Sequence, residues 1–167
     1  MTLSIEQKRR ILERFSSEVW SKGDMDTANE LIDDDLDDHN PFPGMPGKRA
    51  GFEQTVLMFR EAMPDLAITP QNFIVDGELV MDHWEGNATQ TAALATIPAT
   101  GKAVRLSGIG IARIGDSDKI VERWAQFNLM EIMQQLDVVP GGTGWPEWGA
   151  IPEVAEGIST TPEENKA

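Results

Sequence analysis

The side chains best suited to proton transfer are two histidines and a glutamate set in apolar sequence. His39 precedes a proline-rich stretch, His83 stands beside Trp84 in an apolar run, and Glu122 comes two residues before Trp124. An imidazole titrates near neutral pH and can take and return a proton without a metal. These three residues predict an acid–base site if the fold brings them to one pocket.

Glu122 and Trp124 are expected to share a face, because alternate residues of a strand point to the same side of a sheet. Burial in an apolar pocket would raise the pKa of Glu122 and suit it to act as a general acid or base. The alternative is an outward glutamate that is a structural partner for Arg105 or Arg113.

Each histidine also has a structural interpretation. Asp38 could fix the tautomer of His39 by accepting a ring N–H bond, but His39 and Asn40 could instead cap the proline-rich turn. His83 could be a core or surface histidine with no part in chemistry.

Several classes of site are excluded by composition. The chain has no cysteine and two histidines, so thiolate sites, disulfides and a multi-histidine zinc site are not expected. The acidic run 33–38 lacks the glycine and distal glutamate of a calcium loop and predicts a solvated acidic face. No phosphate loop or dinucleotide fingerprint is present. We therefore expect neither metal nor cofactor.

The charge balance limits the partners. Lys and Arg number 14 against 28 Asp and Glu, a formal net charge of −14, which disfavours nucleic acid and anionic membrane surfaces. No apolar run is long enough to span a bilayer, and the N-terminus lacks signal-peptide features. The prediction is a cytoplasmic protein whose partner is a hydrophobic small molecule.

The hydrophobic periodicity changes along the chain. It predicts helices first, over 5–22, from Asp24 to Ile32, and from Gly51 to Met63, and then strands joined by tight turns. The strands are expected over 67–69, 73–75, 79–89, 104–114 and 119–127, before a short helix over 129–136. This order predicts an α+β fold with helices on one face of a curved, mostly antiparallel sheet. Residues 1–139 form the expected domain, and 140–167 a Pro/Gly/Glu-rich tail, in part disordered.

A series of short motifs resembles one family, the SnoaL-like polyketide (ester) cyclases of the nuclear transport factor 2-like superfamily. In chain order they are Asp38-His39-Asn40-Pro41, Gly51, Met63-Pro64-Asp65-Leu66, Asp76-Gly77-Glu78-Leu79-Val80, Gly86, Pro98-Ala99-Thr100-Gly101-Lys102, Lys119-Ile120-Val121-Glu122-Arg123-Trp124 and Met133-Gln134-Gln135-Leu136. The resemblance implies a cone-shaped α+β barrel around one deep apolar pocket, and a homodimer formed through the outer face of the sheet.

The resemblance also implies site residues. It places His83 inside the cone, since a basic residue precedes Trp at the matching position of many relatives, and His39 at the mouth. The catalytic aspartate of the cyclases is absent from the last strand, where Gln126 and Asn128 could instead donate hydrogen bonds to an oxyanion. Gln90 replaces a histidine of many relatives, and Gln90 and Asn40 are further candidates for binding substrate.

Aromatic side chains could line a pocket for a flat aromatic or polycyclic ligand, although such residues are more often plain core. They include Phe59, Trp84 and Trp124. The prediction is a cofactor-free lyase, isomerase or cyclase acting on a hydrophobic ketone, diol or hydroxy-carbonyl compound. The alternatives are an epoxide hydrolase, for which Asp82, Glu122 and Arg105 would supply the groups, and a non-catalytic binding module.

Overall fold

The computed structural model describes residues 3–139, so the predicted tail over 140–167 lies outside the described residues. Five strands form one sheet in the order β1-β5-β4-β3-β2. Strand bounds are β1 Ile32–Asp38, β2 Ala67–Asp76, β3 Leu79–Thr89, β4 Ala103–Ile114 and β5 Ile120–Phe127; the helices are α1 Ile5–Arg14, η1 Phe15–Trp20, α2 Met25–Leu31, α3 Arg49–Ala62 and α4 Leu129–Gln135.

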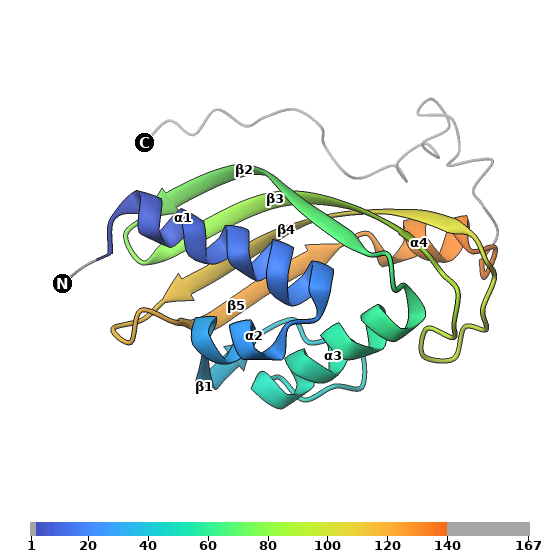
Figure 1. Ribbon diagram of the computed structural model, residues 1–167, viewed down its shortest axis with the longest axis horizontal. Helices are drawn as coiled ribbons and strands as arrows, with labels where there is room; N and C mark the ends of the chain where they lie inside the picture. Colours follow the sequence, from blue (N-terminus) through green and yellow to red (C-terminus); the bar gives the residue numbers. More distant parts are fainter. Residues whose placement is uncertain (1–2, 140–167) are drawn as a thin grey trace, which may run out of the picture.

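The predicted architecture is confirmed. Helices α1, α2 and α3 lie along one side of the sheet, and α4 packs at one end of it (Figure 1). The sheet is curled rather than closed, and β1 pairs in parallel with β5 while the other pairs are antiparallel. The α+β cone is therefore the fold of this chain.

The first helical stretch begins and continues as its sequence predicts, but it changes pitch. A capping box of Ser4 and Gln7 starts α1, because each side chain bonds a backbone N–H that the first turn leaves without a partner. From Phe15 to Trp20 the helix widens into a π-helix, which the periodicity did not predict. Two of its residues, Phe15 and Val19, are buried in the core.

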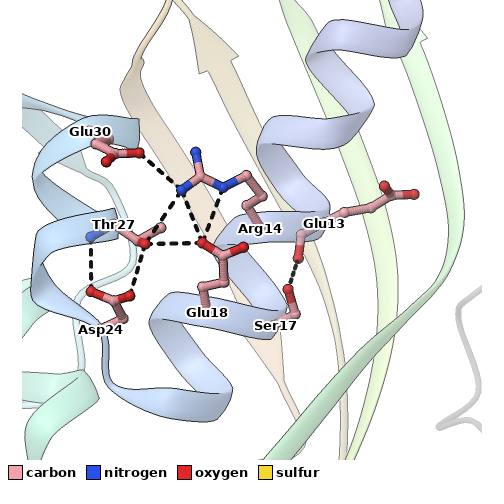
Figure 2. A network of polar contacts seen from close by, with 7 residues as sticks. All are labelled: Glu13, Arg14, Ser17, Glu18, Asp24, Thr27 and Glu30. Atoms are coloured by element: carbon pink, nitrogen blue, oxygen red, sulfur yellow. Dashed lines mark hydrogen bonds and ion pairs between the residues drawn. The ribbon is translucent and has the colours of Figure 1, made fainter.

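A polar network fixes this π-helix to α2 (Figure 2). Arg14 donates to Glu18 at 3.0 Å and to Glu30 at 2.9 Å. The Thr27 hydroxyl lies 3.0 Å from both Glu18 and Asp24, and its one proton can serve either carboxylate. The network therefore holds α2 against the end of α1 and the π-helix.

Strand β1 is the element that sequence reasoning missed. The acidic run was expected to be a solvated face leading into a loop, yet it forms an edge strand parallel to β5. Ile32 and Leu36 are fully buried, and a register irregularity between Ile32 and Asp37 hides the usual two-residue alternation. Asp37 pairs with Lys48 at 3.0 Å on the exposed side, so the interpretation as an acidic face holds for part of the run.

The central strands align small residues on the inner face of the sheet. Asp82 of β3 is paired with Gly110 of β4, and Gly110 with Ala125 of β5. Two residues further along β4, Ala112 is paired with Arg123 of β5. Because side chains at paired positions point to the same face, this row leaves space between the sheet and the helices.

Within residues 3–139, no helix is both long and apolar enough to cross a membrane.

Candidate functional site

A pocket lies between the helical layer and the inner face of the sheet. Its walls are mainly aromatic and aliphatic, with a few polar groups. The lining residues are Leu12, Phe15, Ser16, Trp20, Asp38, Asn40, Phe42, Thr55, Phe59, Leu66, Ile68, Asp82, Trp84, Leu106, Gly110, Ile111, Ala112, Ile120, Arg123, Trp124, Ala125 and Phe127. A concave apolar site with few convergent polar groups is typical of small-molecule binding.

Three lining residues carry charge, and they come from three strands. Asp38, Asp82 and Arg123 all border the pocket. Arg123 donates through Nη1 to Asp38 Oδ2 at 2.6 Å, and the two side chains are 13% and 2% exposed. The Arg123 guanidinium also lies 5.0 Å from the centroid of the Phe52 ring. Arg123 and Asp38 therefore form a buried ion pair, held in place on one side by an aromatic ring.

Asp82 is the carboxyl group most altered by its surroundings. It is 4% exposed, and loss of hydration raises its pKa to about 6, against opposing contributions from backbone N–H groups and from Arg123. A carboxyl with a pKa near neutrality can both accept and return a proton at working pH. Asp82 is thus the group in this pocket best suited to acid–base chemistry.

Glycine at position 110 provides the space that this carboxylate occupies. A Cβ atom built on Gly110 would lie 2.6 Å from Asp82 Oδ1, closer than real Cβ contacts allow. The same holds at Gly108, whose Cβ would lie 2.4 Å from the Trp84 ring. The two glycines let Asp82 and Trp84 lie against the backbone of β4.

The expected inward orientation of His83 is wrong. His83 is exposed, while its neighbour Asp82 is buried and lines the pocket. Only one of two consecutive strand residues can face inward, and burial shows that it is Asp82. Asp82, named from the sequence only for the epoxide hydrolase alternative, is the residue in the pocket.

Glu122 also does not line the pocket. It accepts two hydrogen bonds from Arg113, at 3.2 and 2.9 Å, and this guanidinium lowers the pKa of Glu122. The alternative considered from sequence, a structural partner for Arg113, is therefore confirmed. The raised pKa expected for Glu122 is wrong because its strand phase is opposite to that of Arg123.

His39 lies against Trp124 rather than among the inward groups. The two rings are parallel, with centroids 4.4 Å apart, and Nε2 of His39 is 4.0 Å from Glu122 Oε2. Asp38 does not orient this ring, since it pairs with Arg123 and accepts from the Asn40 backbone N–H at 3.2 Å.

The residues predicted to bind substrate fall into two groups. All four of Phe59, Asn40, Trp84 and Trp124 border the pocket. Trp124 has the strand phase of Glu122, however, and its ring stacks on His39. The others do not line it; they are Gln126, Asn128 and Gln90.

These three residues have other positions. Gln126 is exposed, and Asn128 caps α4 by accepting from Glu131 N. Gln90 is fully buried and bonds Pro98 and Thr100. Gln90 therefore fixes the loop that follows β3, and none of the three is placed to touch a ligand in this pocket.

Asp38 and Arg123 are the functional candidates that sequence reasoning missed. They are 85 residues apart and meet only because β1 pairs with β5. An arginine placed one residue from Glu122 was a signal, since the two must face opposite sides of a strand. Charge alone did not show which side was the pocket.

Comparisons with known proteins agree with the fold described above. A family model described as SnoaL-like polyketide cyclase matches residues 10–136. TsrD from Streptomyces laurentii superposes with a TM-score of 0.74 at 19% identity, covering 82% of this chain and 99% of that chain, which shows likeness of fold. No curated protein sequence gives a significant match.

Two further solved structures share more sequence. IdmH from Streptomyces antibioticus, a candidate polyketide cyclase, has 25% identity and a TM-score of 0.68 over 78% of this chain and 99% of that chain. A candidate polyketide cyclase from Acidithiobacillus ferrooxidans has 28% identity and a TM-score of 0.67 over 81% of this chain and 99% of that chain.

Proposed function

The chain belongs to the SnoaL-like polyketide cyclase family, and from this premise we propose that it is a cofactor-independent acid–base enzyme. Its substrate is a hydrophobic, flat carbonyl compound, and its reaction is a cyclisation, isomerisation or aldol-type step. The single observation that carries this proposal is Asp82, a buried carboxyl group with a pKa of about 6 in an aromatic pocket.

The proposed step is a proton transfer at carbon. The Asp82 carboxylate removes a proton from the carbon next to the substrate carbonyl, and the electron pair of that C–H bond moves into the enolate. The enolate then takes the proton back from Asp82 at another carbon of a conjugated system, or attacks a second carbonyl group, whose alkoxide oxygen takes that proton. Arg123, whose charge is balanced by Asp38, carries further N–H donors at the same pocket, and hydrogen bonds from them favour the enolate in a water-poor site. A positioned general base contributes roughly 10²–10⁴-fold to such a step.

The decisive experiment compares two neighbours on β3. The full chain, Asp82→Asn and His83→Asn are incubated with panels of hydrophobic β-keto esters and hydroxyketones, followed by chromatography and mass analysis. Asp82→Asn should lose ~10²–10⁴-fold in turnover, whereas His83→Asn, which changes the outer face, should keep it. Turnover that survives Asp82→Asn would refute the assignment of Asp82.

A non-catalytic binding module predicts a different result in the same assay. A ligand that stabilises the protein and is recovered unchanged between pH 5 and 9 would favour that module over an enzyme. The proposed enzyme instead loses turnover as the pH falls below about 6, because Asp82 must be ionised to act as a base.

Epoxide hydrolysis is the second candidate, supported by one specific observation. Two carboxylates and a guanidinium, those of Asp38, Asp82 and Arg123, border the same pocket. The groups named for this reaction from sequence were partly others: Arg105 instead pairs with Glu85 at 2.9 Å and is largely exposed. Diol formation from hydrophobic epoxides, abolished by both Asp82→Asn and Asp38→Asn, would favour this candidate over carbonyl chemistry.

A homodimer through the outer face of the sheet remains our proposal for assembly. Exposed apolar side chains, those of Ile74, Leu79 and Ile109, stand on that face. Such a patch favours burial against another surface. The mass in solution measured by light scattering should fall to that of a monomer in Ile109→Glu, and a monomeric starting protein would contradict the proposal.

A further inference from the structure

The hydrogen-bonding capacity of Arg123 is only partly used within the protein. A guanidinium has five N–H donors, and among the described residues only Nη1 donates, to Asp38 Oδ2. Every fully buried side-chain nitrogen in that part of the chain has a partner. The Nε and Nη2 atoms of Arg123, which have no partner among these residues, are therefore not fully buried, and Arg123 lines the pocket.

Two contacts restrain the Arg123 guanidinium. Its Cζ lies over the Phe52 ring, 5.0 Å from the ring centroid. Asp38 holds one edge at 2.6 Å. A planar guanidinium clamped in this way presents its remaining N–H groups in its own plane, a geometry that suits an oxygen with concentrated negative charge.

The charge count decides which kind of oxygen fits. Asp38 and Arg123 compensate one another, so ionised Asp82 leaves one excess negative charge among the described lining residues. A permanent anion bound beside Arg123 would add a second negative charge to a buried cluster, which is unfavourable. A neutral acid that passes its proton to Asp82 leaves the total charge unchanged.

We propose that Arg123 determines ligand specificity: its free donors bind the oxygen of a weak oxygen acid, a phenol or the enol of a 1,3-dicarbonyl compound, whose proton passes to Asp82. In this transfer the ligand O–H bond breaks, its electron pair stays on the ligand oxygen, and a new O–H bond forms on the carboxylate. No co-reactant is needed, and hydrogen bonds from Arg123 to the ligand oxyanion offset the weaker basicity of the carboxylate. The inference deepens the proposed function and rests on it for the choice of pocket.

The test is calorimetric and spectroscopic binding of three flat probes to the full chain: 2-naphthol, 2-methoxynaphthalene and 2-naphthoate. At pH 8, binding of 2-naphthol should neither release protons to the solvent nor take them up. Calorimetric titrations in buffers of different ionisation enthalpy measure this number of protons. The absorption of 2-naphthol should shift to that of the naphtholate. The methoxy compound, which has no O–H group, should bind more weakly, and equal binding of the two would overturn the proposal.

The carboxylate probe tests the charge count directly. Because 2-naphthoate is already an anion, its binding should take up close to one proton. Its affinity should fall about tenfold per pH unit above the Asp82 pKa of about 6. The affinity of 2-naphthol should not change over pH 7–8. In Asp82→Asn, the affinity for 2-naphthoate should become independent of pH and 2-naphthol should bind un-ionised. A pH-independent 2-naphthoate affinity in the unaltered chain would overturn the proposal.

A conservative variant separates the donor geometry from the charge. Arg123→Lys keeps the positive charge that Asp38 needs and removes the planar fork, and it should weaken 2-naphthol by roughly tenfold or more. Arg113→Lys is the matched control on the outer face and should bind 2-naphthol unchanged. Equal weakening in both variants would overturn the proposal.

These measurements do not require turnover, so the two proposals can fail separately. If the protein binds 2-naphthol as naphtholate but transforms no carbonyl compound, the specificity inference holds and the proposed enzyme activity is refuted. Turnover that depends on Asp82, with 2-naphthol bound un-ionised, would do the reverse.

Discussion

The two faces of one sheet hold the same kinds of side chain in opposite states. On the inner face, Asp82 is buried, and desolvation raises its pKa to about 6. On the outer side, Glu122 is paired with Arg113, which lowers the pKa of Glu122. Asp82 is on β3 and Glu122 is on β5 of the same sheet, and β4 lies between these two strands.

The comparison shows that the environment, rather than the residue type, selects the group suited to chemistry. A histidine is the usual candidate near neutral pH, yet both histidines lie away from the inward cluster. A carboxylate reaches the same pH range when the inner face removes its water and offers no direct ion pair. The Asp38–Arg123 pair borders the same pocket, and its two charges compensate each other.

The largest effect should come from separating the buried ion pair. Arg123→Gln leaves Asp38, 2% exposed, without its partner, and should lower the free energy of unfolding by about 3–5 kcal/mol. Denaturant unfolding of Arg123→Gln, Asp38→Asn and the double variant gives the coupling free energy between the two side chains. Arg113→Gln, the outer counterpart, should unfold close to the unaltered chain, and an equal loss there would erase the contrast between the faces.

Removing the inner carboxylate should stabilise the fold at neutral pH. The Asp82 pKa of about 6 in the fold exceeds its ordinary 3.8, so the native state binds the extra proton and loses stability as the pH rises from about 4 to 6. Asp82→Asn should therefore be more stable than the unaltered chain by about 3 kcal/mol at pH 8. The two proteins should unfold alike at pH 3 to 4. Thermal unfolding from pH 3 to 8 measures this difference in stability. An Asp82→Asn variant less stable than the unaltered chain at pH 8 would contradict the prediction.

Filling the space under that carboxylate should have an intermediate effect. In Gly110→Ala the new Cβ meets Asp82 Oδ1 at 2.6 Å unless the side chain rotates, so we expect a loss of about 1–3 kcal/mol. Ile109→Ala changes the adjacent, half-exposed outer position and should cost less. Equal melting temperatures for Gly110→Ala and Ile109→Ala would show that the close contact at Gly110 does not affect stability.

The smallest effect, with the opposite sign to Asp82, is expected from Glu122. Its pKa is lowered by Arg113, so this carboxylate contributes stability above its unfolded pKa and loses it as the pH falls through its folded pKa. Glu122→Gln should therefore be slightly less stable than the unaltered chain at pH 7 and equal to it well below pH 4. The difference should shrink in high salt, because the pair is accessible to ions.

The order of elements could be predicted because it depends on local signals. The capping box at Ser4 and the turn at Asp76-Gly77 act over a few residues, and the strand periodicity acts over about ten. The long hairpins β2–β3 and β3–β4 follow from them. β1 was missed because aspartates rarely form strands, and its burial depends on pairing with a strand far along the chain.

Predicting the site required knowing which of two consecutive residues on β3, Asp82 or His83, faces the pocket. Around Asp82 and His83 the sequence is apolar on both sides, as Val80 and Met81 show, so alternation does not reveal which residue faces inward. The register with β4 decides it, through the space at Gly110. The Asp38–Arg123 pair likewise needs a contact across 85 positions. Local pattern determined the elements, and long-range register determined the pocket.

The π-helix over Phe15–Trp20 has a consequence for how this pocket can diverge. A π segment accommodates one residue more than an α-helix over the same length, so a single-residue deletion there converts it to regular helix. Such a deletion removes the extra residue without displacing the helix on either side, so its effect falls on the side chains of the segment itself, of which Phe15, Ser16 and Trp20 line the pocket. Changes of length in this segment offer a route to new ligand shapes that leaves every strand, and the proton-transfer group on β3, untouched.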